Sequence, residues 1–379
     1  MKNSAIKTRN FITRVLYQNI AKPIFFLIDP EKIHDIMIRM GNILGSNGIT
    51  RSATSLFFSY SDKRLEQNIL GIPFKNPIGL AAGFDKNAEI IDILPSCGFG
   101  YGEVGSITGE PCEGNPKPRL WRLKKSKGLV VYYGLKNNGC EHIAGNLKEK
   151  KYHIPIGISI AKTNCKLTAD KTEGIKDYAK AFAMLEKFAD YITINISCPN
   201  AFGGQPFTNP QDLNDLLTDI EKIPSSKPIF LKLSPDVSFQ EIDDLIHICD
   251  QHRVHGFICT NLTKDKTSTE LQKYWKEAGQ QALGGISGKP IKDMSTKLIA
   301  HVYQKTKGKY IIIGCGGVSS AEDAYEKIKA GASLIQLITG MIFEGPQVIS
   351  EINRKLVELL RYDGYQNISE AIAVSSQKY

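Results

Sequence analysis

The segment from Ile194 to Asn200 places a thiol and two carboxamides beside the end of an apolar run. The run at 191–196 has the composition of a buried parallel strand, and parallel α/β proteins carry their chemistry where strands end. Amides of Asn195 and Asn200 flanking Cys198 suit a polar heterocycle that is held by hydrogen bonds while one proton is removed. Asn, Ser and Pro also favour plain turns, and a free cysteine is usually a small buried hydrophobe, so this segment alone leaves a structural role open.

Similar apolar runs recur along the chain, each ending in polar or glycine residues and followed by a helix-like segment. The runs that we predict to be strands are Ile78–Ala81, Gly102–Gly105, Ile156–Ala161, Tyr191–Ile196, Ile229–Leu233, Gly256–Thr260, Tyr310–Gly314 and Leu334–Ile338. Eight such units over roughly 300 residues predict an α/β fold, a (β/α)8 or TIM barrel, whose active site lies at the carboxyl ends of the strands.

Glycines follow the last two predicted strands. In this fold the loops after strands seven and eight commonly bind a phosphate, so Gly316 and Gly317 predict a ligand with a phosphate group. Ser319 followed by Glu322 predicts a capping box that begins the next helix. The segment Gly284 to Pro290 is a second glycine-rich loop, which we expect to close over the ligand or to hold the same phosphate.

Several motifs in this order resemble one family. The strings AAGFDKN, GNPKPRLWRL, NISCPN, LKLSPD, CTN, GGISGKP, IIGCGGVSS and AGASLIQL, between Asn76 and Thr339, are similar to those of dihydroorotate dehydrogenase. The resemblance implies FMN as cofactor and the oxidation of dihydroorotate to orotate in pyrimidine biosynthesis. The segment from Leu27 to Asp35 resembles the helical N-terminal extension of the membrane-associated type, which implies a quinone as electron acceptor.

The matching motifs imply a role for each site residue. Cys198 is implied as the catalytic base, with Lys86, Asn195, Asn200 and Asn261 as substrate-binding residues. The cofactor-binding residues implied are Ala82, Gly83, Lys86, Ser106, Ser159, Asn195, Lys232, Thr260, Ser287, Gly288, Gly316, Gly317, Ile338 and Thr339.

The chain departs from the family pattern at three of these positions and at Val131. Cys198 stands where quinone-type members usually have Ser, and Val131 where the family has an Asn that contacts substrate. Ser159 replaces an Asn near the flavin, and Ile338 replaces a Tyr. Loss of one amide at Val131 would cost about 1–3 kcal/mol if its partner stayed unpaired, so a divergent FMN oxidoreductase acting on another cyclic amide or enone stays open. A barrel isomerase without redox chemistry is the alternative of a different class.

The N-terminal residues predict a small helical extension. Asp29 and Pro30 suit the cap and first position of a helix. The apolar residues recur at helical spacing in two stripes: Ile33, Ile36, Met37 and Met40, and upstream Phe11, Ile12, Val15, Leu16 and Ile20. Five basic residues precede the first acid: Lys2, Lys7, Arg9, Arg14 and Lys22. A basic amphipathic segment favours peripheral contact with a membrane surface; a helical cap packed on the barrel is the plainer alternative.

We therefore expect residues 1–60 to form a membrane-associating extension and residues 61–379 the FMN-binding barrel, with the boundary between Ser46 and Gln67. Without Met1 to Ser46 the barrel should still bind flavin, and reaction with quinone should suffer most. No apolar run approaches the ~20 residues that span a bilayer, and no signal peptide is recognisable. The expected location is the cytoplasmic side of the cell membrane.

Composition narrows the possible partners. The chain has 379 residues and a formal charge of +9 that is spread along its length, without a basic, aromatic-rich motif, so no nucleic-acid partner is expected. Its eight cysteines form no CxxC pair, which favours a reducing compartment and argues against disulfides or a metal site.

Overall fold

The computed structural model describes residues 2–148, 150–198, 200, 202–279 and 283–379. Eight parallel strands close into a barrel in the order β3-β4-β7-β8-β9-β10-β12-β13, so each strand pairs with the next barrel strand along the chain. The barrel strands are β3 (Ile78–Leu80), β4 (Tyr101–Ile107), β7 (Ile156–Ile160), β8 (Tyr191–Ile194), β9 (Ile229–Leu233), β10 (Gly256–Cys259), β12 (Ile311–Cys315) and β13 (Leu334–Leu337). The predicted (β/α)8 fold is confirmed, with every strand where the apolar runs placed it.

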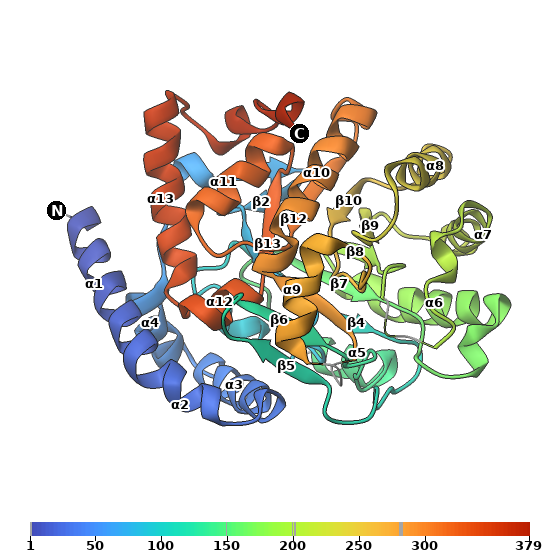
Figure 1. Ribbon diagram of the computed structural model, residues 1–379, viewed down its shortest axis with the longest axis horizontal. Coiled ribbons are helices and arrows are strands. Elements are labelled where there is room, and N and C mark those ends of the chain that lie inside the picture. The colour runs from blue at the N-terminus through green and yellow to red at the C-terminus, as the bar shows by residue number, and fades with distance from the viewer. Residues whose placement is uncertain (1, 149, 199, 201, 280–282) are drawn as a thin grey trace.

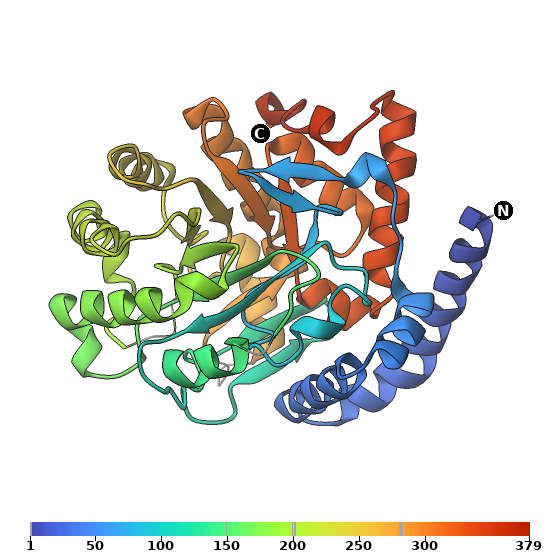
Figure 2. The same cartoon turned by 180° about the vertical axis from the view of Figure 1, so that it is seen from behind.

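Helices surround the barrel and the extension lies at one side of it (Figure 1). The helices outside the extension are α5 (Cys140–Lys148), α6 (Lys171–Leu185), α7 (Pro210–Glu221), α8 (Phe239–Cys249), α9 (Thr269–Ala278), α10 (Lys292–Thr306), α11 (Ala321–Ala330), α12 (Thr339–Glu344) and α13 (Val348–Asp363). The hairpin of β1 (Gln67–Ile69) and β2 (Ile72–Phe74) lies on the opposite side of the barrel from β5 and β6 (Figure 2). Its Ile69 and Phe74 pack with Tyr101 and Tyr191 in a separate apolar cluster.

A helix of the extension packs beside the first barrel strand. We expected a helix after every strand, but only a 3₁₀ turn, Ile91–Ile93, lies between β3 and β4. Helix α3 (Pro30–Gly45) packs against this turn, so closely that a Cβ at its Gly41 would lie 2.9 Å from the Ile90 side chain. The Asn42 side chain donates to the Glu89 carbonyl at 2.9 Å. The extension is therefore built into the wall of the barrel.

The extension has four helices, α1 (Lys2–Leu16), α2 (Lys22–Leu27), α3 and α4 (Gly48–Phe58), with a π-helical turn between α1 and α2. As predicted, Asp29 caps α3, accepting from the Lys32 amide, and Pro30 begins it. Helix α4 lies within the segment that we expected to form the boundary. None of the helices in the described part of the chain is long and apolar enough to cross a bilayer.

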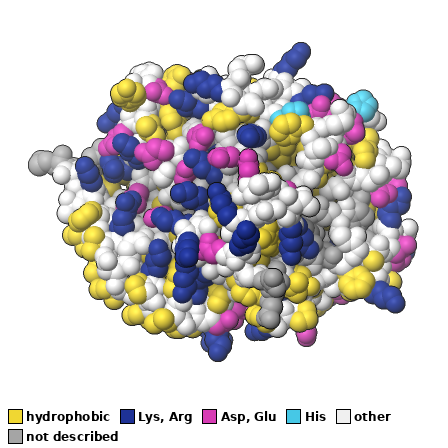
Figure 3. Space-filling model, in the orientation of Figure 1, with side chains coloured by type: hydrophobic (Ala, Val, Ile, Leu, Met, Phe, Trp, Pro, Cys, Tyr) yellow, Lys and Arg dark blue, Asp and Glu magenta, His cyan; other side chains and the backbone are white. Residues whose placement is uncertain are grey.

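The apolar stripe and the basic residues, which together suggested a membrane surface, face different ways in the structure. The apolar stripe of α1 and the π-helical turn after it faces solvent, since Phe11 is 65% and Ile20 56% exposed. Hydrophobic side chains gather on this side of the molecule, at the lower left of Figure 3. Three of the five basic residues instead face the barrel. Arg9 donates to the Ser350 hydroxyl, Arg14 pairs with Glu351, and Lys22 donates to the Phe343 carbonyl. These charges dock α1 and α2 on α12 and α13.

An antiparallel sheet of β5 (Leu120–Leu123), β6 (Gly128–Val131) and β11 (Gly285–Gly288) contributes to one wall of the cavity described below. Part of the glycine-rich segment that we expected to be a loop is thus a strand, because β11 pairs with β6. Successive side chains of β6 point to opposite faces of the sheet. Val130 therefore packs with Leu123 and Ile286 in a small apolar core, while Leu129 and Val131 line the cavity.

Candidate active site

A cavity of about 490 Å³ lies between the carboxyl ends of the barrel strands, the β5-β6-β11 sheet and the extension. That volume is within the range of small-molecule and cofactor sites. Its barrel end is lined by polar side chains at the ends of β3, β4, β8, β9, β10 and β13. Its other end is lined by apolar side chains of the extension, among them Phe25, Phe26, Ile33, Met37 and Phe58. The cavity therefore joins a polar compartment to an apolar one.

The structure brings together all but one of the residues that the sequence predicted for the site. Those that line the cavity are Ala82, Gly83, Lys86, Ser106, Asn195, Cys198, Asn200, Lys232, Thr260, Asn261, Ser287, Gly288, Gly316, Gly317, Ile338 and Thr339. They converge because the carboxyl ends of parallel strands meet at one end of the barrel.

Ser159 is the exception, since it is fully buried behind the cavity wall. Its hydroxyl lies 2.7 Å from that of Ser106, which accepts from the Asn195 amide at 2.8 Å. The short Ser159 side chain contacts Ser106, which lines the cavity, and does not reach the cavity itself. Ser159 therefore supports Ser106 and Asn195 instead of lining the site.

The amides of Asn195 and Asn261 are fixed by a compact network around Ser197. Asn261 donates to the Ser197 carbonyl and hydroxyl, each at 3.0 Å, and Asn195 accepts from the Ser197 hydroxyl at 3.0 Å. The Tyr178 hydroxyl donates to the Asn195 carbonyl at 2.8 Å. Because these side chains are already hydrogen-bonded, they present fixed rather than adaptable polar groups to a ligand.

Asn200 faces the cavity with one half of its amide unused. Its nitrogen donates to the Val131 carbonyl at 2.9 Å. Its side-chain oxygen is buried and has no hydrogen-bond partner among the described residues. An unmade hydrogen bond of this kind costs about 1–3 kcal/mol, so the oxygen is suited to accept from a ligand N–H.

The Cys198 thiol is held neutral by its surroundings. Burial raises its pKa above the usual range, and this outweighs the opposing effects of the Asn200 backbone N–H and the positive charges of Lys264 and Lys162. A base at this position needs partial thiolate character, which a neighbouring cation or amide dipoles could supply. Both are present, but desolvation has the larger effect on the pKa. The thiolate fraction of Cys198, and with it the amount of active base, therefore increases only as the pH rises.

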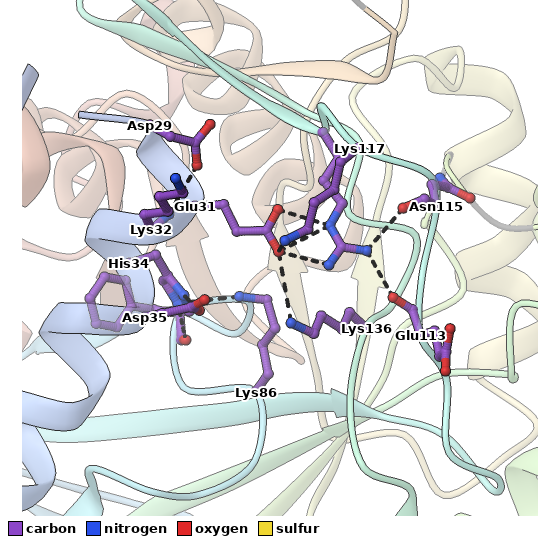
Figure 4. Close-up of polar contacts among 12 residues, drawn as sticks. Asp29, Glu31, Lys32, His34, Asp35, Lys86, Glu113, Asn115, Lys117 and Lys136 are labelled. Carbon is purple, nitrogen blue, oxygen red and sulfur yellow. Dashed lines mark hydrogen bonds and ion pairs between the residues drawn. The ribbon is translucent and has the colours of Figure 1, made fainter. Parts of the chain in front are cut away.

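Lys86 is held by a residue that the sequence analysis did not single out. Its ammonium lies 3.2 Å from His34 Nε2 (Figure 4). It also lies 4.1 Å from the centre of the Tyr133 ring. Desolvation, followed by the charge of Lys136, lowers the pKa of Lys86 to about 7. His34 comes from α3 and its Nε2 also lies 2.7 Å from the Phe84 carbonyl. The only sequence signal for His34 was its place in the segment from Leu27 to Asp35.

The expected phosphate end has a backbone that only glycine fits easily. Gly317 has φ +73° and a Cβ there would lie 2.5 Å from the Lys292 Cα, while a Cβ at Gly288, φ +87°, would lie 2.5 Å from the Thr339 methyl group. The Ser287 and Thr339 hydroxyls are 3.1 Å apart. All four residues, Ser287, Gly288, Gly317 and Thr339, line the cavity.

The helix after these glycines begins one residue later than predicted. Ser320, not Ser319, is the N-cap of α11, and its capping box is closed by Asp323, not Glu322. Asp323 also accepts from the backbone and hydroxyl of Ser319. Ser319 and Ser320 are both residues that favour the N-cap position. Ser320 is the cap because its hydroxyl accepts from the Asp323 N–H while the Asp323 carboxylate accepts from the Ser320 N–H.

The fold and the cavity define a class: a (β/α)8-barrel enzyme with a small-molecule site at the strand ends and an apolar compartment among the helices of the extension. The family model for dihydroorotate dehydrogenase matches residues 64–360. The chain belongs to the dihydroorotate dehydrogenase family.

Relatives cover almost the whole chain. "Dihydroorotate dehydrogenase (quinone)" of Crocosphaera subtropica is 38% identical over 375 residues, 94% of this chain and 98% of the relative. The protein of the same name from Christiangramia forsetii is 37% identical over 351 residues, 90% and 99% of the two chains. The crystal structure of DHODH from Eimeria tenella in complex with ferulenol has a TM-score of 0.81 at 30% identity, covering 91% of this chain and 95% of the other. The match includes the extension and favours dihydroorotate oxidation over both alternative functions.

Proposed function

We propose that this protein oxidises dihydroorotate to orotate in pyrimidine biosynthesis and passes the electrons to a quinone, with FMN as its cofactor. The observation that carries the proposal is the polar compartment itself: fixed amides of Asn195 and Asn261, a buried free acceptor on Asn200 and a thiol at Cys198 line one cavity. A cyclic amide that carries a carboxylate matches these donors and acceptors. The membership in the family supports the same substrate.

The residues present fit FMN. Gly288 and Gly317 line the cavity without a side chain, so a phosphate can approach their backbone closely, and the Ser287 and Thr339 hydroxyls beside them can donate to it. Lys232 and Thr260, at neighbouring strand ends, would hold the isoalloxazine edge. When bound, FMN accepts a hydride and passes two electrons on to the quinone.

The chain's own residues orient the substrate and move one proton. Lys86 would pair with the substrate carboxylate, and Asn200 would accept from a ring N–H. Cys198, as thiolate, takes the proton from the carbon beside the carbonyl; a C=C bond forms as the neighbouring carbon loses its hydride. The raised pKa of Cys198 makes this step faster at higher pH.

The apolar end of the cavity suits a quinone. Phe26, Ile33 and Met37 line it, and the Arg122 guanidinium lies 4.7 Å from the Phe26 ring centre. Arg122 would hold a quinone oxygen while the aliphatic tail lies among the helices of the extension. Arg122 belongs to the motif GNPKPRLWRL, in which nothing local singles it out as a functional residue.

The experiment that tests the function uses the purified full-length protein. We expect a yellow protein whose flavin absorbance is bleached by dihydroorotate under anaerobic conditions and restored by a soluble quinone. A fully loaded flavin that millimolar dihydroorotate leaves oxidised would contradict the proposed substrate and favour a different cyclic amide or enone.

Val131 provides a test of substrate identity. Its backbone is fixed by pairing with Leu120 and Gly285, and its side chain lines the cavity where the family has Asn. We expect Val131→Asn to tighten orotate binding by up to about tenfold, or roughly 1.4 kcal/mol, because one amide contact is added. Titration of the flavin spectrum with orotate measures the change. Weaker orotate binding in the variant would mean that the pocket is built for another molecule.

The protein is further proposed to lie on the cytoplasmic face of the cell membrane as a peripheral protein. The exposed apolar residues of the extension support this contact, among them Phe11, Leu16, Ile20, Leu27 and Ile49. Because Arg9, Arg14 and Lys22 dock on the barrel, insertion of apolar side chains rather than charge supplies most of the attachment.

The double variant Phe11→Ser, Leu16→Ser is expected to bind lipid vesicles at least about tenfold more weakly, since two large apolar side chains no longer leave water. Vesicle co-sedimentation at low and high salt measures this, and we expect little salt dependence. Leu167→Ser with Val374→Ser, also exposed apolar residues but outside the extension, is the matched control. Equal loss in both double variants would place the attachment elsewhere.

A further inference from the structure

A carboxylate of the extension is buried against the barrel. Glu31, in the first turn of α3, is only 5% exposed. It accepts from Arg119 through both oxygens, with Nε at 3.1 and 3.2 Å and Nη2 at 2.7 Å. Figure 4 shows Glu31 reaching from α3 towards Lys117 and Lys136, whose ammonium groups lie 3.5 and 3.7 Å from it. One carboxylate thus forms ion pairs with three cations.

The other side of the Arg119 guanidinium holds a loop. Its Nη1 donates to the carbonyls of Glu113 and Asn115 at 2.8 and 2.9 Å. Arg119 is itself 5% exposed, and its carbonyl accepts from the Tyr132 amide at 2.8 Å. The bidentate geometry with Glu31 therefore fixes the direction of the donors that hold residues 113–115.

Asn115 in that loop in turn holds Asn200 of the candidate site. The Asn115 amide donates to the Asn200 carbonyl at 3.1 Å, and its oxygen accepts from Asn164 at 3.1 Å. Asn164 accepts from the Phe202 amide at 2.6 Å. A continuous set of hydrogen bonds therefore joins α3 to Asn200 and Phe202.

The charge on Glu31 is required for this arrangement. Burial by itself raises the pKa of Glu31, but the Arg119 hydrogen bonds and the nearby positive charges lower it on balance, so the group is ionised at neutral pH. Without the negative charge, Arg119 would remain buried next to Lys117 and Lys136 with no counter-ion. Such a cluster relaxes by moving the guanidinium, and the 113–115 loop would move with it.

We infer that Glu31 is a positioning residue for the dihydroorotate site: through Arg119 and Asn115 it sets the place of Asn200. Helix α3 then serves both ends of the cavity, since Ile33 and Met37 line the apolar passage while Glu31 acts on the polar compartment. Removal of the extension should therefore impair the reaction with dihydroorotate as well as the reaction with quinone. The inference rests on the proposed function, because it assigns the polar compartment to dihydroorotate.

The test compares the two half-reactions in Glu31→Gln, which keeps the side-chain volume and removes the charge. Anaerobic stopped-flow mixing gives the dihydroorotate concentration dependence of flavin reduction, and mixing of the reduced protein with a soluble quinone gives its reoxidation. We expect the apparent dissociation constant of dihydroorotate to rise about tenfold, with reoxidation changed by less than about twofold. Lys117→Gln is the control: it changes one charge beside Glu31, on a side chain that is 67% exposed, and should leave both half-reactions within about twofold of wild type.

Three outcomes overturn the inference: unchanged dihydroorotate binding in Glu31→Gln, an equal fall in both half-reactions, or the same loss in Lys117→Gln. If Glu31→Gln does not fold with flavin bound, Asn115→Ala decides, because it keeps the ion pair and removes the bond to Asn200. Weaker dihydroorotate binding in Asn115→Ala supports the inference and unchanged binding overturns it. Failure of the proposed function is distinguishable, since wild-type flavin would then not be reduced by dihydroorotate at all.

Discussion

Flavin reduction by dihydroorotate is expected to slow by about 10²–10⁴-fold in Cys198→Ala, while flavin and orotate still bind, because the variant lacks the proposed base and keeps the amides around it. Anaerobic stopped-flow absorbance measures the rate. Cys249→Ala removes a buried thiol in α8 that is not among the described residues lining the cavity, and is the matched control. Full-speed reduction in Cys198→Ala would rule this residue out as the base.

The pH dependence sharpens the same prediction. The base acts as thiolate, and burial raises the pKa of Cys198 above its usual range, so the wild-type rate should climb about tenfold per pH unit from neutral pH upward. Cys198→Ser should retain some activity with its rate still rising at higher pH, since a hydroxyl is harder to ionise. A wild-type rate that is flat from pH 6 to pH 9 would contradict a thiol base in these surroundings.

Lys86→Met is expected to weaken orotate binding by about 30-fold or more at pH 6, because the variant leaves the proposed carboxylate partner unpaired in a buried site. Flavin absorbance titrated with orotate gives the dissociation constant. Lys176→Met, on an exposed lysine of α6, is the control and should bind orotate as the wild type does.

The sign of the pH effect follows from the pKa of Lys86, which is lowered to about 7 without ligand. Below this pH the ammonium is already formed and orotate meets a charged partner. Above it, binding must also take up a proton, so wild-type affinity should fall by up to about tenfold per pH unit until the pKa of the complex is reached. Lys86→Met should lose this dependence. Parallel pH profiles in the two proteins would mean that Lys86 does not pair with the carboxylate.

Much of the fold and the site could be predicted from sequence because the signals are local. A run such as Gly256–Cys259 is apolar throughout, as a strand buried on both faces requires, and the polar Thr260 that follows it marks the carboxyl end. Eight such runs fix a barrel, and the barrel brings the strand ends together, so residues as distant as Lys86 and Thr339 were placed in one site from the sequence. Asp29 and Pro30 gave the start of α3 by local cap chemistry.

What only the tertiary structure decided are the partners of long polar side chains. Arg9, Arg14 and Lys22 look like a membrane-facing basic face in the sequence, yet they meet α12 and α13 more than 320 residues further on. Glu31 and Arg119 are 88 residues apart, and neither carries a local mark of burial. Hydropathy periodicity reports which face of an element is apolar. Which charge meets which depends on how α3 packs beside a barrel strand that has no helix of its own, and that depends on the whole fold.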